Sequence, residues 1–384
     1  MTLKLPIYLD NHATTLVDPR VFEAMKPYFS EIFGNPASAT HSFGWMAEEA
    51  VKQAREQVAK LIHADPKKEI IWTSGTTESI NMALLGISKN AGDHIISVVT
   101  EHRAALETLK FLEGNGIQVT YLPVDSHGLV DPENIRKAIT PKTVLISVMA
   151  ANNEIGTIHP IAEIGKIAKE MEILFHVDAA QACGKIPVDV QLMGIDLLSM
   201  SAHKVYGPKG VGALYIRRRN PHVKIEPLIY GGSHEGGLRG GTLNVPGIVG
   251  MGKAFEIAGQ EMETESLRLV SLRDRLYQKL SDKLPQVMLN GHPTQRLAGN
   301  LNVSFLGVRS SDLISQLKDI AISSGSACTS GSLEPSYVIR ALGVGEERAR
   351  SSIRIGLGRF NTEEEIYFAV DKISHAVSEL SLRT

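Results

Sequence analysis

Seven short apolar runs alternate with segments of helical spacing between residues 69 and 216, and no other feature restricts the fold of this chain as strongly. Each run is bounded by turn-forming residues, as is typical of buried strands. Strands that alternate with helices build a largely parallel sheet. The sequence therefore predicts an α/β fold around a seven-stranded, mostly parallel sheet. The strands are expected at Glu69–Thr73, His94–Val99, Gln118–Leu122, Thr143–Met149, Ile173–Val177, Ile195–Met200 and Val211–Ile216.

The segments outside this region are expected to be mostly helical, with a few further strands. Helices are predicted at Pro19–Phe29, at Trp45–Ile62 and from Asn244 to about Lys283, where Pro285 ends the last of them. The remainder of the chain predicts a smaller α/β unit. Its strands are expected near Val287, Leu301 and Ile353, its last helix begins at Glu363, and a short strand is expected at Ile7–Leu9.

Polar clusters follow five of the seven predicted strands. They are Ser74–Ser79, Thr100–His102, Asn152–Glu154, Asp178–Gln181 and Ser201–Lys204. Because open α/β sheets bind ligands outside the carboxyl ends of their strands, we expect these clusters to meet in one site.

Lys204 is the most informative residue of these clusters. It lies between an apolar strand and a glycine-rich turn, with the short polar residues Ser201 and His203 beside it. A lone lysine at such a place is usually a solvated loop residue. A partly desolvated lysine has a lowered pKa and becomes nucleophilic, so a Schiff-base lysine is the functional hypothesis.

Asp178 narrows the choice of cofactor. A carboxylate that ends a buried strand needs a cationic partner, and a protonated pyridine nitrogen supplies one. The Ser74–Ser79 cluster precedes a helix, where small hydroxylic residues either only cap the helix or also attract phosphate. An isolated histidine such as His102 is more often structural. Together, Lys204 and Asp178 suggest pyridoxal phosphate.

Composition excludes several classes of protein. The net charge of −2 and the pI near 6.7 give no sign of a nucleic-acid or anionic-membrane partner. Two cysteines, Cys183 and Cys328, are too few for a disulfide framework or a cysteine-rich metal site. No leader pattern and no apolar run of about 18 residues occurs. We therefore expect a soluble, cytoplasmic protein without a protein-bound metal.

The two cysteines have different surroundings. Cys183 stands between Ala182 and Gly184 after a predicted buried strand, which suits a small core residue. Cys328 lies in the run 323–332, which consists of serine, glycine, alanine and threonine around it. A segment with so few side chains to bury is expected to move between the site and the surface.

These motifs resemble a known family. The series SGTTES, TEH, NNEIG, HVDAAQ and SAHKVYGPKG is similar to that of fold-type I pyridoxal-phosphate enzymes. With GNPAS near the start and SSGSACTSGSLEPSYV near the end, the chain resembles the group I cysteine desulfurases over essentially its whole length. The resemblance implies a large cofactor-binding domain at residues 16–259 and a small domain of residues 1–15 and 260–384 that carries a mobile cysteine loop.

The resemblance also implies roles for particular residues. Lys204, Cys328 and His102 would be catalytic, with Lys204 bound to the cofactor and His102 stacked on its ring. Asp178 would meet the pyridine nitrogen, while Asn153 and Gln181 contact the ring oxygen. Phosphate would be held by Gly75, Thr76, Thr77, Ser201 and His203, and by Thr242 of a second subunit. Arg354 would pair with the substrate carboxylate, assisted by Asn35, which from the sequence alone is an ordinary turn residue before Pro36.

The implied activity is removal of sulfur from L-cysteine, with alanine as product and a persulfide on Cys328. The implied partners are a second copy of the chain and an iron–sulfur scaffold or another sulfur acceptor. A conventional aminotransferase, a non-catalytic scaffold and a selenocysteine lyase remain alternatives. The chain ends at Thr384, whereas many housekeeping relatives carry a longer C-terminal tail that contacts the scaffold, so scaffold docking and the choice between housekeeping and nitrogen-fixation duty stay open.

Overall fold

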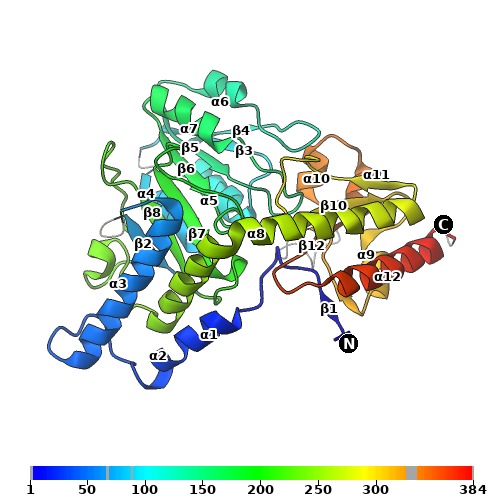
Figure 1. Cartoon of the computed structure of the whole chain (residues 1–384). Helices are drawn as coiled ribbons and strands as arrows, with labels where there is room; N and C mark the ends of the chain where they lie inside the picture. The colour runs from blue at the N-terminus through cyan, green and yellow to red at the C-terminus, as the bar shows by residue number, and fades with distance from the viewer. Residues whose placement is uncertain (1–2, 66–68, 88–89, 326–334, 383–384) are drawn as a thin grey trace.

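The computed structural model describes residues 3–65, 69–87, 90–325 and 335–382. The seven predicted strands form one sheet (Figure 1). Its strands are β2 (Ile70–Thr73), β3 (His94–Val98), β4 (Gln118–Leu122), β5 (Thr143–Met149), β6 (Leu174–Asp178), β7 (Leu197–Ser201) and β8 (Gly212–Ile216). The observed bounds differ from the predicted ones by one or two residues at most.

The order of strands in this sheet is β2-β8-β7-β6-β5-β3-β4. Neighbouring strands pair in parallel everywhere except at β8, which is antiparallel to both β2 and β7. The sheet is therefore mostly parallel, as predicted. Since β2 to β7 all point the same way, the residues that follow them gather at one edge.

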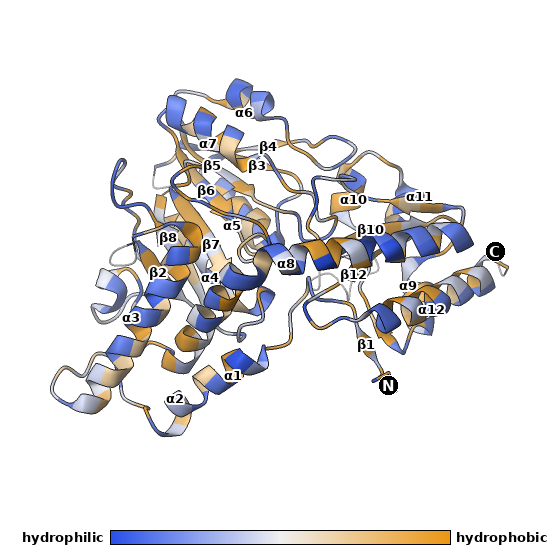
Figure 2. Cartoon of the chain, viewed as in Figure 1, coloured by the Kyte–Doolittle hydropathy of each residue, from blue (hydrophilic) through white to orange (hydrophobic). Residues whose placement is uncertain are grey.

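Helices cover both faces of the sheet, because side chains of alternate strand residues point to opposite faces. Trp72, Ile96 and Ile146 face one core, to which α3 (Ser42–Ile62), α7 (Ile161–Glu170) and the first half of α8 (Val245–Lys283) contribute. Their neighbours Ile71, Ile95 and Leu145 face α4 and α5 on the other side. Figure 2 shows the strands as largely hydrophobic and the helices as two-sided. The helices of this part are α1 (Pro19–Met25), α2 (Pro27–Ser30), α3 (Ser42–Ile62), α4 (Thr76–Ile87), α5 (Arg103–Gly114), α6 (Pro132–Ala138) and α7 (Ile161–Glu170).

The predicted helix at Pro19–Phe29 is wrong in one respect, because the structure has two helices there. The first, α1, ends at Met25 and the second, α2, begins at Pro27. Pro27 has no N–H group and cannot make the hydrogen bond that would continue α1.

A second core is built by the C-terminal part of the chain. Its sheet is antiparallel with the order β12-β10-β9, and the pair β1-β11 lies beside it. The elements are β1 (Ile7–Tyr8), β9 (Val287–Leu289), β10 (Asn300–Phe305), β11 (Ile320–Ala321), β12 (Ser352–Gly356), α9 (Ser310–Gln316), α10 (Tyr337–Ala341), α11 (Glu346–Arg350) and α12 (Glu363–Ser381). No helix in the described ranges has both the length and the apolar character needed to cross a membrane.

The helix α8 (Val245–Lys283) connects the two cores (Figure 1). Its apolar residues Val245, Ile248, Met251, Ala254, Phe255, Ile257 and Ala258 are buried in the core of the large sheet, whereas Leu269, Leu272, Leu276 and Leu280 are buried in the second core. Ile7 and Leu9 also belong to the second core. This change of core within α8 supports our proposal of a domain boundary near residue 259, with residues 1–15 assigned to the small domain.

Candidate active site

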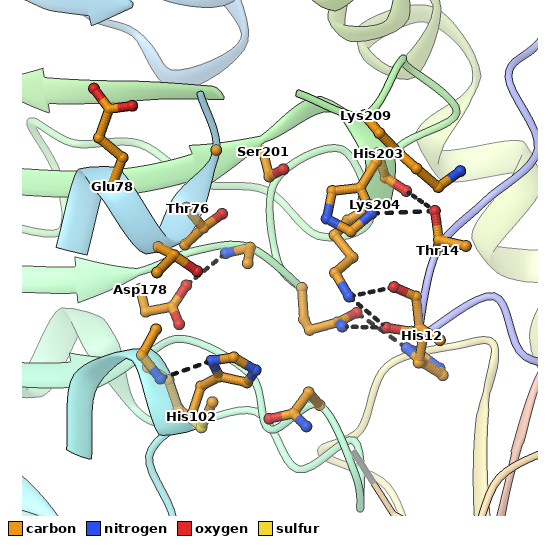
Figure 3. Close-up of a pocket in the computed structure, with 18 of the residues that line it drawn as sticks. His12, Thr14, Thr76, Glu78, His102, Asp178, Ser201, His203, Lys204 and Lys209 are labelled. Atoms are coloured by element: carbon orange, nitrogen blue, oxygen red, sulfur yellow. Dashed lines mark hydrogen bonds between the residues drawn. The ribbon is translucent and has the colours of Figure 1, made fainter. Parts of the chain in front are cut away.

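A cavity of about 520 Å³ lies where the strands of the large sheet end (Figure 3). All five predicted polar clusters contribute to its walls. The contributing residues are Ser74–Glu78, His102, Asn153, Asp178 with Gln181, and Ser201 with His203 and Lys204. The prediction that these clusters meet in one place is confirmed by this geometry.

Lys204 reaches the cavity from the turn that follows β7. A short 3₁₀ helix, Ala202–Lys204, comes directly after the strand, and the Gly207 amide donates to the Ala202 carbonyl at 2.9 Å. A Cβ atom at Gly207 would lie only 2.7 Å from the Cβ of Ala202, so this tight turn requires glycine. The Lys204 Nζ donates to the carbonyls of His12 and Ala13 at 2.8 and 2.7 Å. The N-terminal segment thus holds the lysine amine at the cavity.

Asp178 is the last residue of β6 and is only 4% exposed. Its Oδ1 accepts from the Ala180 amide at 2.9 Å. Burial raises the pKa of this carboxyl to about 6, more than the amide and the nearby Lys204 lower it. A buried carboxylate is unfavourable without a cationic partner, so this position favours binding of a cation beside Asp178.

His102 presents an N–H group to the cavity. It caps α5, and its Nδ1 accepts from the Ala104 amide at 3.1 Å. In a neutral imidazole with Nδ1 as acceptor, the proton is on Nε2. Burial, followed by the charge of Lys204, lowers the pKa of His102 to about 4, so the ring is neutral near pH 7 and His102 is arranged as a donor.

The N-terminus of α4 forms the opposite wall. Gly75 has a φ of +155°, and the hydroxyl of Thr76 is buried without a partner among the described residues. Glu78 is turned away from Lys204 in Figure 3, and its carboxylate accepts from the Ser74 amide and from Arg239. Because the Glu78 carboxylate is paired with Arg239, the backbone N–H groups in the first turn of α4 favour the binding of an anion.

Ser201 and His203 complete this wall on the side of Lys204. The Nδ1 of His203 lies 3.1 Å from the hydroxyl of Thr14. Burial and then Lys204 lower the pKa of His203 to about 4, so the ring contributes hydrogen bonds and no charge near neutral pH. The wall is therefore made of hydroxyl, imidazole and amide groups.

Arg354 enters the cavity from β12 and is 1% exposed. Its Nη2 donates to Asp10 at 2.8 Å, and its Nη1 donates to the carbonyl of Asn153 at 3.0 Å. The Nε of Arg354 and the Oδ1 of Asn153 are buried without a partner in the described part of the chain. Buried polar atoms without partners are rare, and here they belong to two residues that line a cavity with room for a ligand.

Two of the predicted site residues, Asn35 and Thr242, are not among the described residues that line this cavity. Asn35 is exposed, and its side chain accepts from the Ala37 amide at 3.0 Å, which is the behaviour of a turn residue. Thr242 is also exposed. Cys328 lies outside the described residues.

The sequence did not point to the N-terminal segment as part of the site. His12, Ala13 and Thr14 line the cavity, and Lys209 does so from the glycine-rich turn. The only available signal was the polar run Asp10–Thr15 directly after a short strand, and nothing in it specifies a contact with Lys204.

The chain is similar to known proteins over nearly its full length. The model of the family described as aminotransferase class-V matches residues 7–368. The cysteine desulfurase IscS of Anaeromyxobacter dehalogenans is 55% identical over 381 residues, which cover 98% of this chain and 94% of that protein. The cysteine desulfurase IscS of Rickettsia rickettsii is 54% identical, with 98% and 92% covered.

Solved structures show the same likeness. A NifS-like protein, 41% identical, superimposes with a TM-score of 0.91 over 98% of this chain and 100% of that one. A structure described as SspA in complex with cysteine is 39% identical and has a TM-score of 0.82, with 93% and 100% covered.

Proposed function

The chain belongs to the class-V aminotransferase family, and we propose that it is a pyridoxal-phosphate-dependent cysteine desulfurase with Cys328 as sulfur acceptor. The observation that carries the proposal is the convergence of Lys204, Asp178 and Arg354 on one cavity. A lysine amine, a buried carboxyl and a buried guanidinium are the groups needed to hold an aldehyde cofactor, its pyridine nitrogen and an amino-acid carboxylate.

The residues present fit this cofactor. Burial raises the pKa of the Asp178 carboxyl, and a pyridinium nitrogen beside it would compensate the buried charge. The unpaired hydroxyl of Thr76 and the unpaired Oδ1 of Asn153 lie on residues that line the cavity. Gly75, Thr76, Thr77, Ser201 and His203 would hold the phosphate. His102 would lie on the ring face, and Asn153 and Gln181 would contact the ring oxygen.

When bound, pyridoxal phosphate supplies an electron-withdrawing ring that makes the α-proton of an attached amino acid acidic. The Lys204 amine would hold the cofactor, and the same amine, when free, would accept the α-proton of the substrate. The carbonyls of His12 and Ala13 hold the released amine, as they hold it in the structure. Asp178 would keep the ring nitrogen protonated, and the Nε2–H of the neutral His102 would donate a hydrogen bond in the cavity.

Arg354 fixes the substrate by its carboxylate. Its guanidinium is held by Asp10 and by the carbonyl of Asn153, so it has little freedom to turn away. We propose that Asn35 assists from the turn at residues 33–41. A fixed carboxylate orients the α-carbon and the thiol of cysteine for reaction.

Cys328 then attacks the sulfur of the substrate as a thiolate. A sulfur–sulfur bond forms, the carbon–sulfur bond breaks, and its electron pair returns to the carbon skeleton, which takes up a proton and leaves as alanine. The persulfide on Cys328 is passed to an acceptor protein, which we propose to be an iron–sulfur scaffold or another sulfur carrier. This chemistry requires a reduced thiol, which favours a cytoplasmic location.

We further propose that the protein acts as a homodimer in which Thr242 reaches the phosphate site of the other subunit. Large apolar side chains near the start of the chain are exposed, with Phe29 at 64%, Phe33 at 63% and Trp45 at 55%. Exposed apolar groups gathered in one part of a chain mark contact surfaces. A partner that covers them would also bring Asn35 out of solvent.

The test is to incubate the purified protein with L-cysteine and a reductant and to measure alanine and sulfide together. A desulfurase releases them in equal amounts. Formation of pyruvate from alanine, with amino transfer and no sulfide, would instead identify an aminotransferase. A colourless protein with neither product would exclude both enzymes.

A further inference from the structure

The side-chain amide of Gln181 is held in one orientation. Its Nε2 donates to the carbonyl of His12 at 2.9 Å, and its Oε1 accepts from the Nζ of Lys185 at 2.8 Å. A backbone carbonyl can only accept, so exchange of the amide oxygen and nitrogen would break the bond to His12 and would remove the acceptor of the Lys185 N–H. Gln181 is 3% exposed and lines the large cavity.

The ring of His12 supports the same orientation. Its Nδ1 lies 3.1 Å from the Oε1 of Gln181, which can only accept, so Nδ1 carries the proton. His12 is 3% exposed, and its Nε2 has no partner among the described residues. Burial above all, and then the charge of Lys185, keeps the pKa of His12 well below the usual value. The ring is therefore neutral, with a fixed tautomer.

Lys185 donates to Gln181 among the described residues, and burial lowers its pKa to about 7. The charged groups that act on it are Lys204, Glu265 of α8 and Arg354 of β12. Glu265 accepts from Arg359 at 2.7 Å. Lys185 is absent from the walls of the large cavity in the described structure and lines a separate cavity of about 30 Å³. It is thus placed to act on the site through Gln181.

We propose that Lys185 is a positioning residue that holds the Gln181 amide with its second N–H directed at the cofactor ring oxygen. The inference rests on the proposed cofactor and adds a residue to its binding. With Lys185 in place, the Nε2 of Gln181 gives one hydrogen to His12 and keeps the other for the cavity. Without Lys185 the amide oxygen keeps only His12 as a donor and the amide rotates more easily, and in the exchanged orientation its carbonyl oxygen repels an anionic ring oxygen.

The test is a pH titration of the visible absorbance of the bound cofactor. Loss of a hydrogen-bond donor to the anionic ring oxygen disfavours the deprotonated form of the bound cofactor. Lys185→Met should therefore move the midpoint of the absorbance titration to higher pH by roughly one unit. Loss of the positive charge of Lys185 would act in the same direction. A double-mutant cycle with Gln181→Leu separates the two causes, because only the orientation effect requires the amide.

In the Gln181→Leu background we expect Lys185→Met to cause little further shift. Lys185→Arg, which keeps charge and donor, should return the midpoint toward the wild-type value. An unshifted midpoint in Lys185→Met would overturn the inference, and so would an equal shift in both backgrounds, since Lys185 would then act by charge alone.

Two further measurements keep the test decisive. If Lys185→Met does not yield folded protein, Lys185→Leu, which likewise removes the donor, should shift the midpoint in the same direction, and by more while Gln181 is present. An unshifted Lys185→Leu would count against the inference. The cofactor content of the wild type is measured first. A wild type that binds no pyridoxal phosphate contradicts the proposed function. A wild type that binds it, together with variants whose midpoint is unshifted, contradicts only the role of Lys185.

Discussion

The guanidinium of Arg354 and the carboxylate of Asp10 lie 2.8 Å apart, although 344 positions separate them in the chain. Arg354 belongs to β12, and Asp10 directly follows the N-terminal strand segment. The same guanidinium donates to the carbonyl of Asn153, which follows β5 of the large sheet. One buried side chain therefore joins the N-terminal segment, the small sheet and the large sheet at the cavity.

Asp10→Ala should weaken both the fold and substrate binding. Removal of one partner leaves a buried charge uncompensated, and because Asp10 is 18% exposed, we expect a loss of about 2 kcal/mol in the free energy of unfolding. A loosened Arg354 should raise KM for cysteine about tenfold, with kcat less affected. Denaturant unfolding and steady-state kinetics measure the two effects. Asp10→Asn keeps an acceptor for Arg354, so its stability and its KM should lie between those of the wild type and Asp10→Ala. An unchanged KM in Asp10→Ala would show that the position of Arg354 does not depend on this ion pair.

Lys204→Ala should abolish turnover and the visible absorbance of the bound cofactor. No other amine is held at the cavity by two backbone carbonyls, as far as the described residues show. Borohydride reduction of the wild type, followed by peptide mass spectrometry, should locate the pyridoxyl group on Lys204. Its appearance on Lys185 or Lys209 would refute the assignment.

Asp178→Asn should make the cofactor-free protein more stable at pH 7, although it abolishes efficient catalysis. The folded-state pKa of about 6 lies above the unfolded value of 3.8, so the unfolded chain loses this proton first. The ionised carboxyl therefore lowers the free energy of unfolding progressively as the pH rises from about 4 to 6. Above pH 6 the loss is on the order of 3 kcal/mol. Thermal unfolding of both apoproteins between pH 4 and 7 measures the difference. If their stabilities run parallel over this range, Asp178 is not the source of the pH dependence.

The strands and the polar clusters at their ends could be predicted because both are local patterns. The apolar run before Asp178, for example, specifies a buried strand, and a parallel sheet brings such strand ends together. The contact of Lys204 with His12 could not be predicted, since it joins residues 192 positions apart through a backbone carbonyl. Every residue has a backbone carbonyl, so the residue types in a sequence do not indicate which carbonyl accepts a hydrogen bond. The pair of Arg354 with Asp10 has no local sequence pattern either.

The helix break at Pro27 is a different case. The apolar spacing of Pro19–Phe29 favours one helix, but the missing N–H of a single proline outweighs it. The cofactor phosphate assignment for Thr242 and the substrate assignment for Asn35 depend on a second copy of the chain. A single chain leaves both residues exposed, so neither its sequence pattern nor its fold tests them.

A mixture of two inactive variants tests the shared site. If Thr242 serves the neighbouring subunit, a heterodimer of Lys204→Ala with Thr242→Ala contains one site with both residues intact. Subunit exchange should then restore up to about half of wild-type activity per heterodimer, and sedimentation should show a dimer. A fully active monomer, or a mixture no more active than its components, would exclude a shared site.

The two cysteines offer a matched pair for the sulfur-transfer step. Cys183 is 4% exposed, and burial, followed by the charge of Asp178, raises the pKa of its thiol far above the usual value. It is therefore a thiol near neutral pH and a poor nucleophile. Cys183→Ala should keep turnover close to wild type.

Cys328→Ala should bind pyridoxal phosphate and react with cysteine to the point of α-proton loss, because none of the residues proposed to hold the cofactor is changed. Without a thiolate to attack the substrate sulfur, neither alanine nor sulfide should then accumulate with a reductant. Mass spectrometry of unreduced wild type after one exposure to cysteine should find one added sulfur on the peptide that contains Cys328. Release of alanine and sulfide by Cys328→Ala at the wild-type rate would rule out the persulfide route, and direct elimination would have to replace it.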